Sequence, residues 1–93
     1  MVNEQYTIRL LVKGKVQGVF FRKYTRNKAL ELGLEGEVMN QPDGSVCVYA
    51  TGQKTQLEAL KKLCQAGPPA ARVTEVIIEE VELKKFSGFH ILK

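Results

Sequence analysis

The sequence has few of the residue types that usually build catalytic and metal sites. It contains one histidine and two cysteines. His90 falls in a short terminal strand pattern and has no serine or cysteine placed to act with it, so we interpret it as an edge-strand or surface residue. Cys47 and Cys64 have no histidine or second cysteine at ligand spacing, which gives a metal site no support. Without a secretory signal, both cysteines are better interpreted as buried free thiols than as a disulfide.

Long apolar runs are also missing. No stretch approaches the roughly 18–20 apolar residues that span a bilayer. Residues 1–6 have no basic region and no apolar core, so they do not read as a signal peptide. We therefore expect a cytoplasmic protein with no membrane partner. A chain of 93 residues that is 44% hydrophobic and 26% charged predicts a single globular domain over residues 1–93.

Acidic residues are absent from positions 5–30, although this stretch carries seven of the 14 basic residues of the chain. The seven are Arg9, Lys13, Lys15, Arg22, Lys23, Arg26 and Lys28. We expect these charges to surround the loop at residues 14–22, where they would raise the local concentration of an anionic ligand. Nucleic acid is a second partner that a basic patch suggests, and a solvated basic face is the third interpretation.

The residue pattern predicts strands and helices in alternation. Strands are predicted where apolar and polar residues alternate, at 5–13, 35–40, 45–51, 73–83 and 89–92. Apolar residues at helical spacing predict a helix at about 21–32, which Gly33 ends, and a second helix that begins near Thr55 and stops at Gly67. The pattern from Thr55 to Glu58 predicts a capping box at the start of the second helix.

The predicted order is β-α-β-β-α-β with a short C-terminal strand. Two split βαβ units with right-handed crossovers give an α+β ferredoxin-like sandwich, in which two helices cover one face of an antiparallel sheet. Because this fold hosts many unrelated functions, the site must carry the functional argument.

Residues 14–22 (Gly-Lys-Val-Gln-Gly-Val-Phe-Phe-Arg) join the first predicted strand to the first predicted helix. Two glycines permit a tight loop, and free amides at a helix N-terminus favour an anion such as phosphate. Arg22 adds a guanidinium that binds two phosphate oxygens at once. Gly18 is followed by Val19 and not by lysine, so this is no nucleotide P-loop. A merely structural turn is the alternative.

The same residues resemble the first signature of the acylphosphatase family, and residues 36–46, continuing to Gly52, resemble the second. Both resemblances are long and correctly spaced, and the predicted order of elements agrees over almost the whole chain. The resemblance implies a small metal-independent hydrolase, with no cofactor, that cleaves acyl phosphates to a carboxylate and inorganic phosphate.

The resemblance also implies roles for individual residues. Arg22 matches the arginine that binds phosphate, and Asn40 matches the asparagine that positions the attacking water. The amide cradle falls on Gln17, Gly18, Val19, Phe20 and Phe21. Since a carboxylate is a good leaving group, such a site needs alignment and charge stabilisation rather than a strong general acid. Taken by itself, Asn40 also fits a turn residue before a Pro-Asp-Gly turn.

One position departs from the family pattern. Glu37 stands where the family usually has an aromatic residue, and in an alternating strand it should face away from Asn40. We expect this change to affect packing or surface charge rather than the water position. It leaves open a phosphate- or carbamoyl-phosphate-binding domain with weak or lost catalysis. An RNA-binding module is the other alternative, although Tyr49 is the only aromatic residue in the predicted strand at 45–51 on which a base could stack. The expected partner is a small acyl phosphate and not nucleic acid, and the expected state is a monomer.

Overall fold

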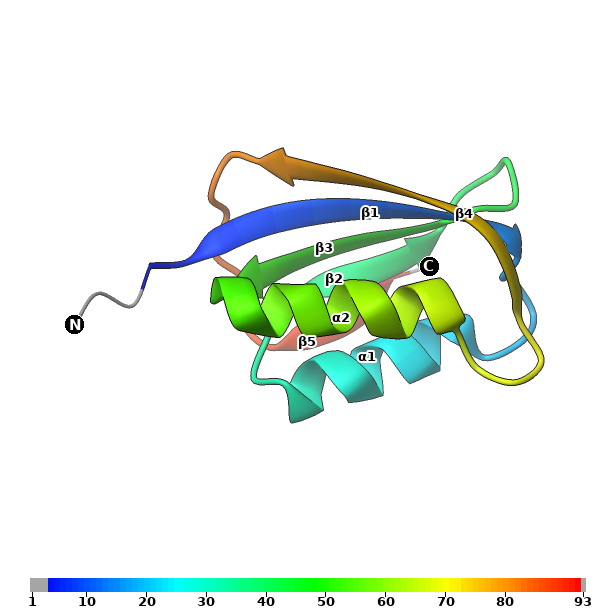
Figure 1. Ribbon diagram of the computed structural model, residues 1–93, viewed down its shortest axis with the longest axis horizontal. Helices are drawn as coiled ribbons and strands as arrows, with labels where there is room; N and C mark the ends of the chain where they lie inside the picture. The colour runs from blue at the N-terminus through cyan, green and yellow to red at the C-terminus, as the bar shows by residue number, and fades with distance from the viewer. Residues whose placement is uncertain (1–3, 93) are drawn as a thin grey trace.

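Two helices cover one face of a five-stranded sheet in the computed structural model, which describes residues 4–92 (Figure 1). The elements in chain order are β1 (Tyr6–Lys15), α1 (Phe21–Glu31), β2 (Glu35–Asn40), β3 (Val46–Gly52), α2 (Lys54–Ala66), β4 (Arg72–Val81) and β5 (Phe89–Leu92). The predicted α+β ferredoxin-like fold is therefore confirmed. The helix predicted at about 21–32 and the strands predicted at 35–40 and 89–92 agree closely with α1, β2 and β5.

The strand order across the sheet is β4-β1-β3-β2-β5. The central strand pairs are antiparallel, as predicted, because β1 pairs antiparallel with β3 and β4, and β2 pairs antiparallel with β3. The short C-terminal strand adds to β2 in the parallel direction, so the sheet as a whole is mixed. Consequently β1, β2 and β5 all run the same way, and their carboxyl ends reach the same edge of the sheet.

The start of α2 corrects one prediction. Its N-cap is Gln53, whose backbone is extended, and its capping box joins Gln53 to Gln56. The Gln53 amide donates to Oε1 of Gln56 over 2.8 Å. The capping box predicted from Thr55 to Glu58 is wrong because the helix begins at Lys54, which places Thr55 inside its first turn.

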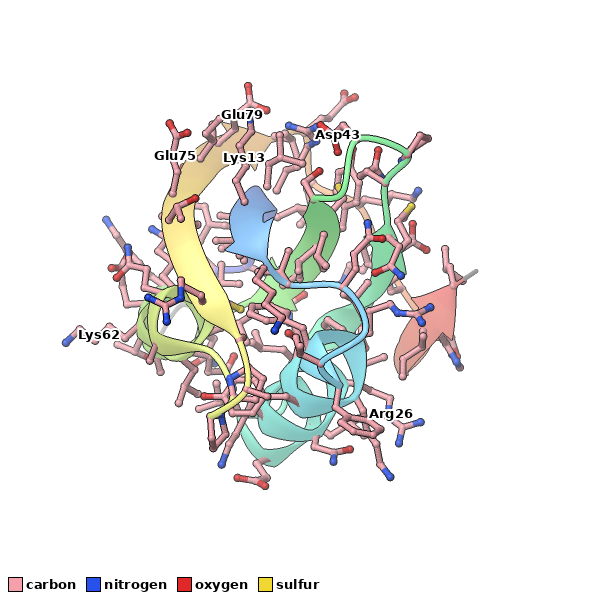
Figure 2. The ribbon with its side chains drawn as sticks, turned by 90° about the vertical axis from the view of Figure 1, so that its right-hand side faces the viewer. Lys13, Arg26, Asp43, Lys62, Glu75 and Glu79 are labelled. Atoms are coloured by element: carbon pink, nitrogen blue, oxygen red, sulfur yellow. The ribbon has the colours of Figure 1, made fainter. Side chains whose placement is uncertain are left out.

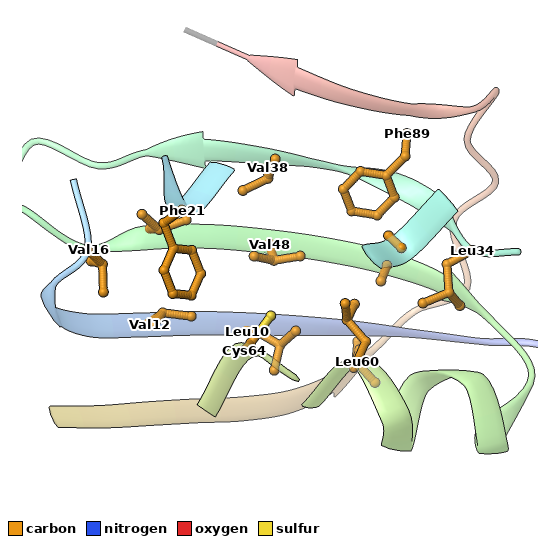
Figure 3. Close-up of a cluster of buried hydrophobic side chains, with 14 of the residues drawn as sticks. Leu10, Val12, Val16, Phe21, Leu34, Val38, Val48, Leu60, Cys64 and Phe89 are labelled. Carbon is orange, nitrogen blue, oxygen red and sulfur yellow. The ribbon is translucent and has the colours of Figure 1, made fainter. Parts of the chain in front are cut away.

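The hydrophobic core lies between the sheet and the two helices (Figure 3). Strand residues that alternate towards the helices, such as Leu10, Val38 and Val48, are fully buried. Phe21, the first residue of α1, is also buried and belongs to the same core layer as Val16 (Figure 3). Burial of an aromatic side chain contributes about 1.5–3 kcal/mol. The burial of Phe21 therefore fixes where α1 begins, and with it the position of the next residue, Arg22.

The residues that the sequence left without a role have structural explanations. Cys47 and Cys64 are both buried and free, as predicted. Burial raises the pKa of the Cys64 thiol to about 12, which makes it a poor nucleophile. His90 is exposed on β5, an edge strand, where Nε2 lies 2.6 Å from the carbonyl oxygen of Ser87. None of the helices within residues 4–92 has the length and apolar character needed to cross a membrane.

Candidate active site

The loop at residues 16–20 meets two other segments at one end of the molecule. Figure 2 views this end, where the loop from β1 to α1 lies near the β2–β3 turn, marked by Asp43, and near β5. The parallel course of β1, β2 and β5 explains the meeting, because Lys15, Asn40 and Leu92 end strands that run in the same direction. Residues far apart in the sequence thus surround one cavity.

The cavity has a volume of about 260 Å³. Its lining residues are Val16, Gly18, Phe20, Phe21, Arg22, Lys23, Asn40 and Ile91. The two residues that the family resemblance singles out, Arg22 and Asn40, therefore open onto one space although they come from different elements. Of the predicted amide cradle, Gly18, Phe20 and Phe21 line the cavity directly. The other two, Gln17 and Val19, belong to the same loop without lining it.

Two buried valines hold the loop in place. Val16 and Val19 have exposed fractions of 1% and 7%, and both belong to the hydrophobic core. Gly18 and Phe20 alternate with them, are exposed to solvent, and have left-handed φ angles of 73° and 63°. Alternation of right- and left-handed backbone turns successive amides towards the same side and forms an anion-binding concavity.

The amide groups of the loop have no hydrogen-bond partner among the residues that the structure describes. In the part of the chain from 4 to 92, no backbone or side-chain acceptor receives a hydrogen bond from the amides of residues 17–21. Helix α1 begins at Phe21 without a side-chain cap and without an acidic residue in its first turn. Because an anion satisfies free amides and interacts favourably with the positive end of the helix dipole, this is a suitable site for one.

Arg22 is tied to the C-terminal strand. Its Nη1 donates to the carbonyl oxygen of Leu92 over 3.2 Å. This is the one hydrogen bond of the guanidinium to residues 4–92, and a guanidinium has five N–H donors. The half-buried side chain is therefore held beside the cavity with donors to spare for a ligand.

Asn40 ends β2 on the helix-covered side of the sheet, next to the buried Val38 in the alternation. Its side-chain Oδ1 is buried and has no hydrogen-bond partner within residues 4–92. Three buried side-chain atoms share this condition, and only the one on Asn40 belongs to a residue that lines the cavity. A buried acceptor without a partner costs about 1–3 kcal/mol, so its presence here points to a ligand or a water molecule as its partner.

Glu37 lies on the opposite face of β2. It is paired in register with Tyr49, and the β2–β3 pairing runs without a register shift as far as Asn40. The prediction that Glu37 faces away from Asn40 is therefore confirmed. Its carboxylate is not among the groups that line the cavity.

The side chain of Gln17 connects the loop at residues 16–20 to the β2–β3 turn that follows Asn40. Its Nε2 donates to the carbonyl oxygens of Gln41 and Ser45, over 2.8 Å and 2.9 Å. The turn that it contacts is ordered by Asp43, whose Oδ1 accepts from the amide and the hydroxyl of Ser45 and whose pKa is lowered by these bonds. Sequence reasoning assigned Gln17 a backbone role only, and no spacing signal reveals a contact that depends on where a distant turn lies.

The expectation that seven basic residues surround the loop is wrong for several of them. Only Arg22 and Lys23 line the cavity. Arg9 lies in the middle of β1, where its Nη1 forms an ion pair with Glu79 over 3.0 Å. Lys13 is paired in register with Glu75 of β4 (Figure 2). Local charge at the cavity therefore comes from two side chains and the helix N-terminus rather than from a broad basic face.

No group of three or more histidine, cysteine, aspartate or glutamate side chains within residues 4–92 is arranged to hold a metal ion. Metal independence stays a prediction that chelation tests. The donors at the cavity are amides, a guanidinium, an ammonium and a carboxamide, and these suit a phosphate group.

Comparison with known proteins agrees with this arrangement. A model of the acylphosphatase family matches residues 8–91. The acylphosphatase of Marinobacter nauticus is 53% identical over 81 residues, which cover 86% of this chain and 88% of that protein. The acylphosphatase of Acaryochloris marina is 45% identical over 86 residues, or 92% of both proteins. The solved structure of an acylphosphatase from Coxiella burnetii has a TM-score of 0.92 at 40% identity, and the match covers 97% of this chain and 94% of that one. Since the match spans both halves of the site over nearly the full length, the chain belongs to the acylphosphatase family.

Proposed function

We propose that the cavity binds the phosphate group of an acyl phosphate through the amides of residues 17–21 and the guanidinium of Arg22, while Asn40 positions the attacking water. The hydrolysis of acyl phosphates itself follows from membership of the family. The proposal concerns which groups of this chain bind and align the reactants.

The phosphate half of the proposal rests on charge and geometry. Amides at the N-terminus of α1 that have no partner within residues 4–92 supply fixed donors, and Arg22 supplies a guanidinium cation. Phosphoryl transfer places negative charge on the three equatorial oxygens of the phosphoryl group, so donors arranged in advance stabilise the transition state without reorganising. The link from Arg22 to Leu92 keeps the guanidinium from turning towards solvent.

The water half rests on Asn40. The buried Oδ1, which has no partner within residues 4–92, accepts a hydrogen bond from a water molecule and so orients a lone pair of the water oxygen towards phosphorus. The water oxygen forms a bond to phosphorus as the bond from phosphorus to the acyl oxygen breaks. The carboxylate leaves with the electron pair of that bond, and a proton of the water passes to the substrate itself. No side chain is required as a strong acid because a carboxylate leaves readily.

The observation that carries the proposal is the presence of these unpaired groups around one cavity. The loop amides and the Arg22 guanidinium come from residues 17–22 and the Oδ1 of Asn40 from the end of β2, and within residues 4–92 each lacks a sufficient partner. Their convergence on one cavity, rather than the lack of a partner for any single amide, favours an anion site over a purely structural turn.

Steady-state hydrolysis of benzoyl phosphate tests the roles. Arg22→Ala should lower kcat/KM by at least about 100-fold and weaken inhibition by inorganic phosphate, because it removes charge-assisted bonds to the phosphate. Asn40→Ala should lower kcat by about 100-fold while leaving phosphate inhibition within about twofold, because it removes only the alignment of the water.

Arg9→Ala is the matched control, since Arg9 pairs with Glu79 away from the cavity. This variant should leave kcat/KM and the inhibition by inorganic phosphate unchanged. Full activity in Arg22→Ala or in Asn40→Ala would contradict the assigned roles. Binding of phosphate without turnover by the unaltered protein would instead favour a domain with lost catalysis.

A further inference from the structure

Phe20 is an unusual residue for its position. Its exposed fraction is 79%, the highest among the exposed large hydrophobic residues. It is also the one non-glycine residue within residues 4–92 with a positive φ, at 63°. The most exposed aromatic ring within residues 4–92 therefore belongs to a residue in the left-handed backbone conformation, which residues other than glycine rarely adopt.

Neither folding nor solubility accounts for this choice. A left-handed conformation costs an L-residue free energy that glycine avoids and that asparagine largely avoids. An exposed ring also recovers almost none of the stabilisation that burial brings. Backbone outliers of this kind cluster at functional sites, where the strain is part of the function.

The surroundings of Phe20 indicate what the ring contacts. The residue lines the same cavity as Arg22 and Asn40, and its own amide belongs to the proposed phosphate cradle. In an acyl phosphate, a single bridging oxygen separates phosphorus from the carbonyl carbon. A phosphate held by the 17–21 amides therefore brings the acyl group close to the side chain of Phe20. Ile91, half-buried on β5, adds a second apolar side chain to the lining.

We propose that the Phe20 ring, together with Ile91, forms the acyl-group subsite and gives the enzyme a preference for acyl phosphates with an aromatic or bulky apolar acyl group. This inference rests on the proposed function, because the phosphate must occupy the cradle for the acyl group to reach the ring. Stacking against an aromatic face and removal of apolar surface from water both favour such a substrate over acetyl phosphate.

The test compares benzoyl phosphate with acetyl phosphate in the same assay. Phe20→Ala should lower kcat/KM for benzoyl phosphate by about tenfold and change that for acetyl phosphate by less than about twofold. Phe20→Tyr keeps an aromatic face and should retain the preference. Inhibition by inorganic phosphate should stay constant in every variant, which shows that the cradle is intact.

Two further variants separate the ring from the backbone. Phe20→Asn removes the ring and tolerates the left-handed conformation, so it should lose the preference while folding at least as well as the unaltered protein. Leu30→Ala removes a different exposed apolar side chain, which lies on α1 and does not line the cavity. This variant should behave as the unaltered enzyme.

Equal losses for both substrates, or no change in either, would overturn the subsite. Saturable binding of single-stranded RNA that depends on Phe20 would show that the ring stacks on bases instead. Failure of the unaltered protein to hydrolyse either substrate would count against the proposed function itself.

Discussion

Replacement of Gln17 by alanine should both loosen the active site and destabilise the fold. The side chain makes two hydrogen bonds, to the carbonyl oxygens of Gln41 and Ser45. At about 1 kcal/mol for each bond, their loss should lower the free energy of unfolding by about 2 kcal/mol. For a domain of this size that corresponds to a decrease of roughly 10 °C in Tm. Both carbonyl oxygens keep one backbone partner, so neither is orphaned.

The effect on catalysis follows from what the two bonds connect. Val16 and Val19 still anchor the loop in the core, so the amide cradle should persist and KM should change by less than about threefold. The distance between the cradle and Asn40, however, is no longer fixed by a side-chain contact. A misplacement of about 1 Å can cost 100-fold in rate, and with the valine anchors intact we expect kcat to fall about tenfold.

Gln56→Ala is the matched control for this prediction. It also removes a glutamine side chain that bonds to backbone, at the N-terminus of α2 and away from the cavity. Loss of such a cap lowers stability by about 1 kcal/mol and should leave kcat unchanged. Gln17→Glu preserves the side-chain length but places a carboxylate against two carbonyl oxygens, so it should impair turnover at least as much as alanine. Thermal unfolding measures the stability of each variant, and benzoyl phosphate kinetics measure its kcat. An unchanged kcat in Gln17→Ala would refute the positioning role.

Three further outcomes are expected. Gly18→Ala should lower stability by only about 1–2 kcal/mol, because a Cβ there meets open space and only the φ of 73° is unfavourable; Gly36→Ala should lower it by more, since a Cβ there collides with the backbone carbonyl of Tyr49. Denaturation at several pH values should show one contribution to the free energy of unfolding that is present below pH 9 and decreases as the pH rises to about 12. The cause is burial, which raises the pKa of Cys64 from 9.0 to about 12. Cys64→Val should remove this part of the dependence of stability on pH. Hydrolysis of benzoyl phosphate should be unaffected by a chelator, and loss of activity that added metal restores would contradict metal independence.

Much of the fold could be predicted because its signals are local. The alternation in 35–40 predicts a strand with Asn40 and Glu37 on opposite faces, and the register with β3 confirms it. Gly33 has the left-handed φ expected of a helix end. Arg22 lies just inside α1, as the step from strand pattern to helix pattern predicts.

The remaining features depend on contacts between distant segments. The parallel pairing of β5 with β2 brings Leu92 to Arg22, and nothing in the four residues of β5 specifies that neighbour. The bonds of Gln17 depend on where the β2–β3 turn lies in space. The strain at Phe20 is likewise invisible in the sequence, because phenylalanine rarely adopts this conformation. Sequence reasoning therefore named several residues that line the candidate site and missed the contacts that hold it together.

Titration of the ¹⁵N-labelled protein with inorganic phosphate, followed through its amide signals, tests the central claim most directly. The account predicts saturable shifts that are largest for the amides of residues 17–21, accompanied by the side-chain signal of Arg22, and predicts that Arg22→Ala weakens binding at least about tenfold. Asn40→Ala should change the dissociation constant for phosphate in the same titration by less than about twofold. Shifts centred elsewhere on the chain, or phosphate binding that is indifferent to Arg22, would contradict the assignment of the 17–21 loop as the phosphate cradle.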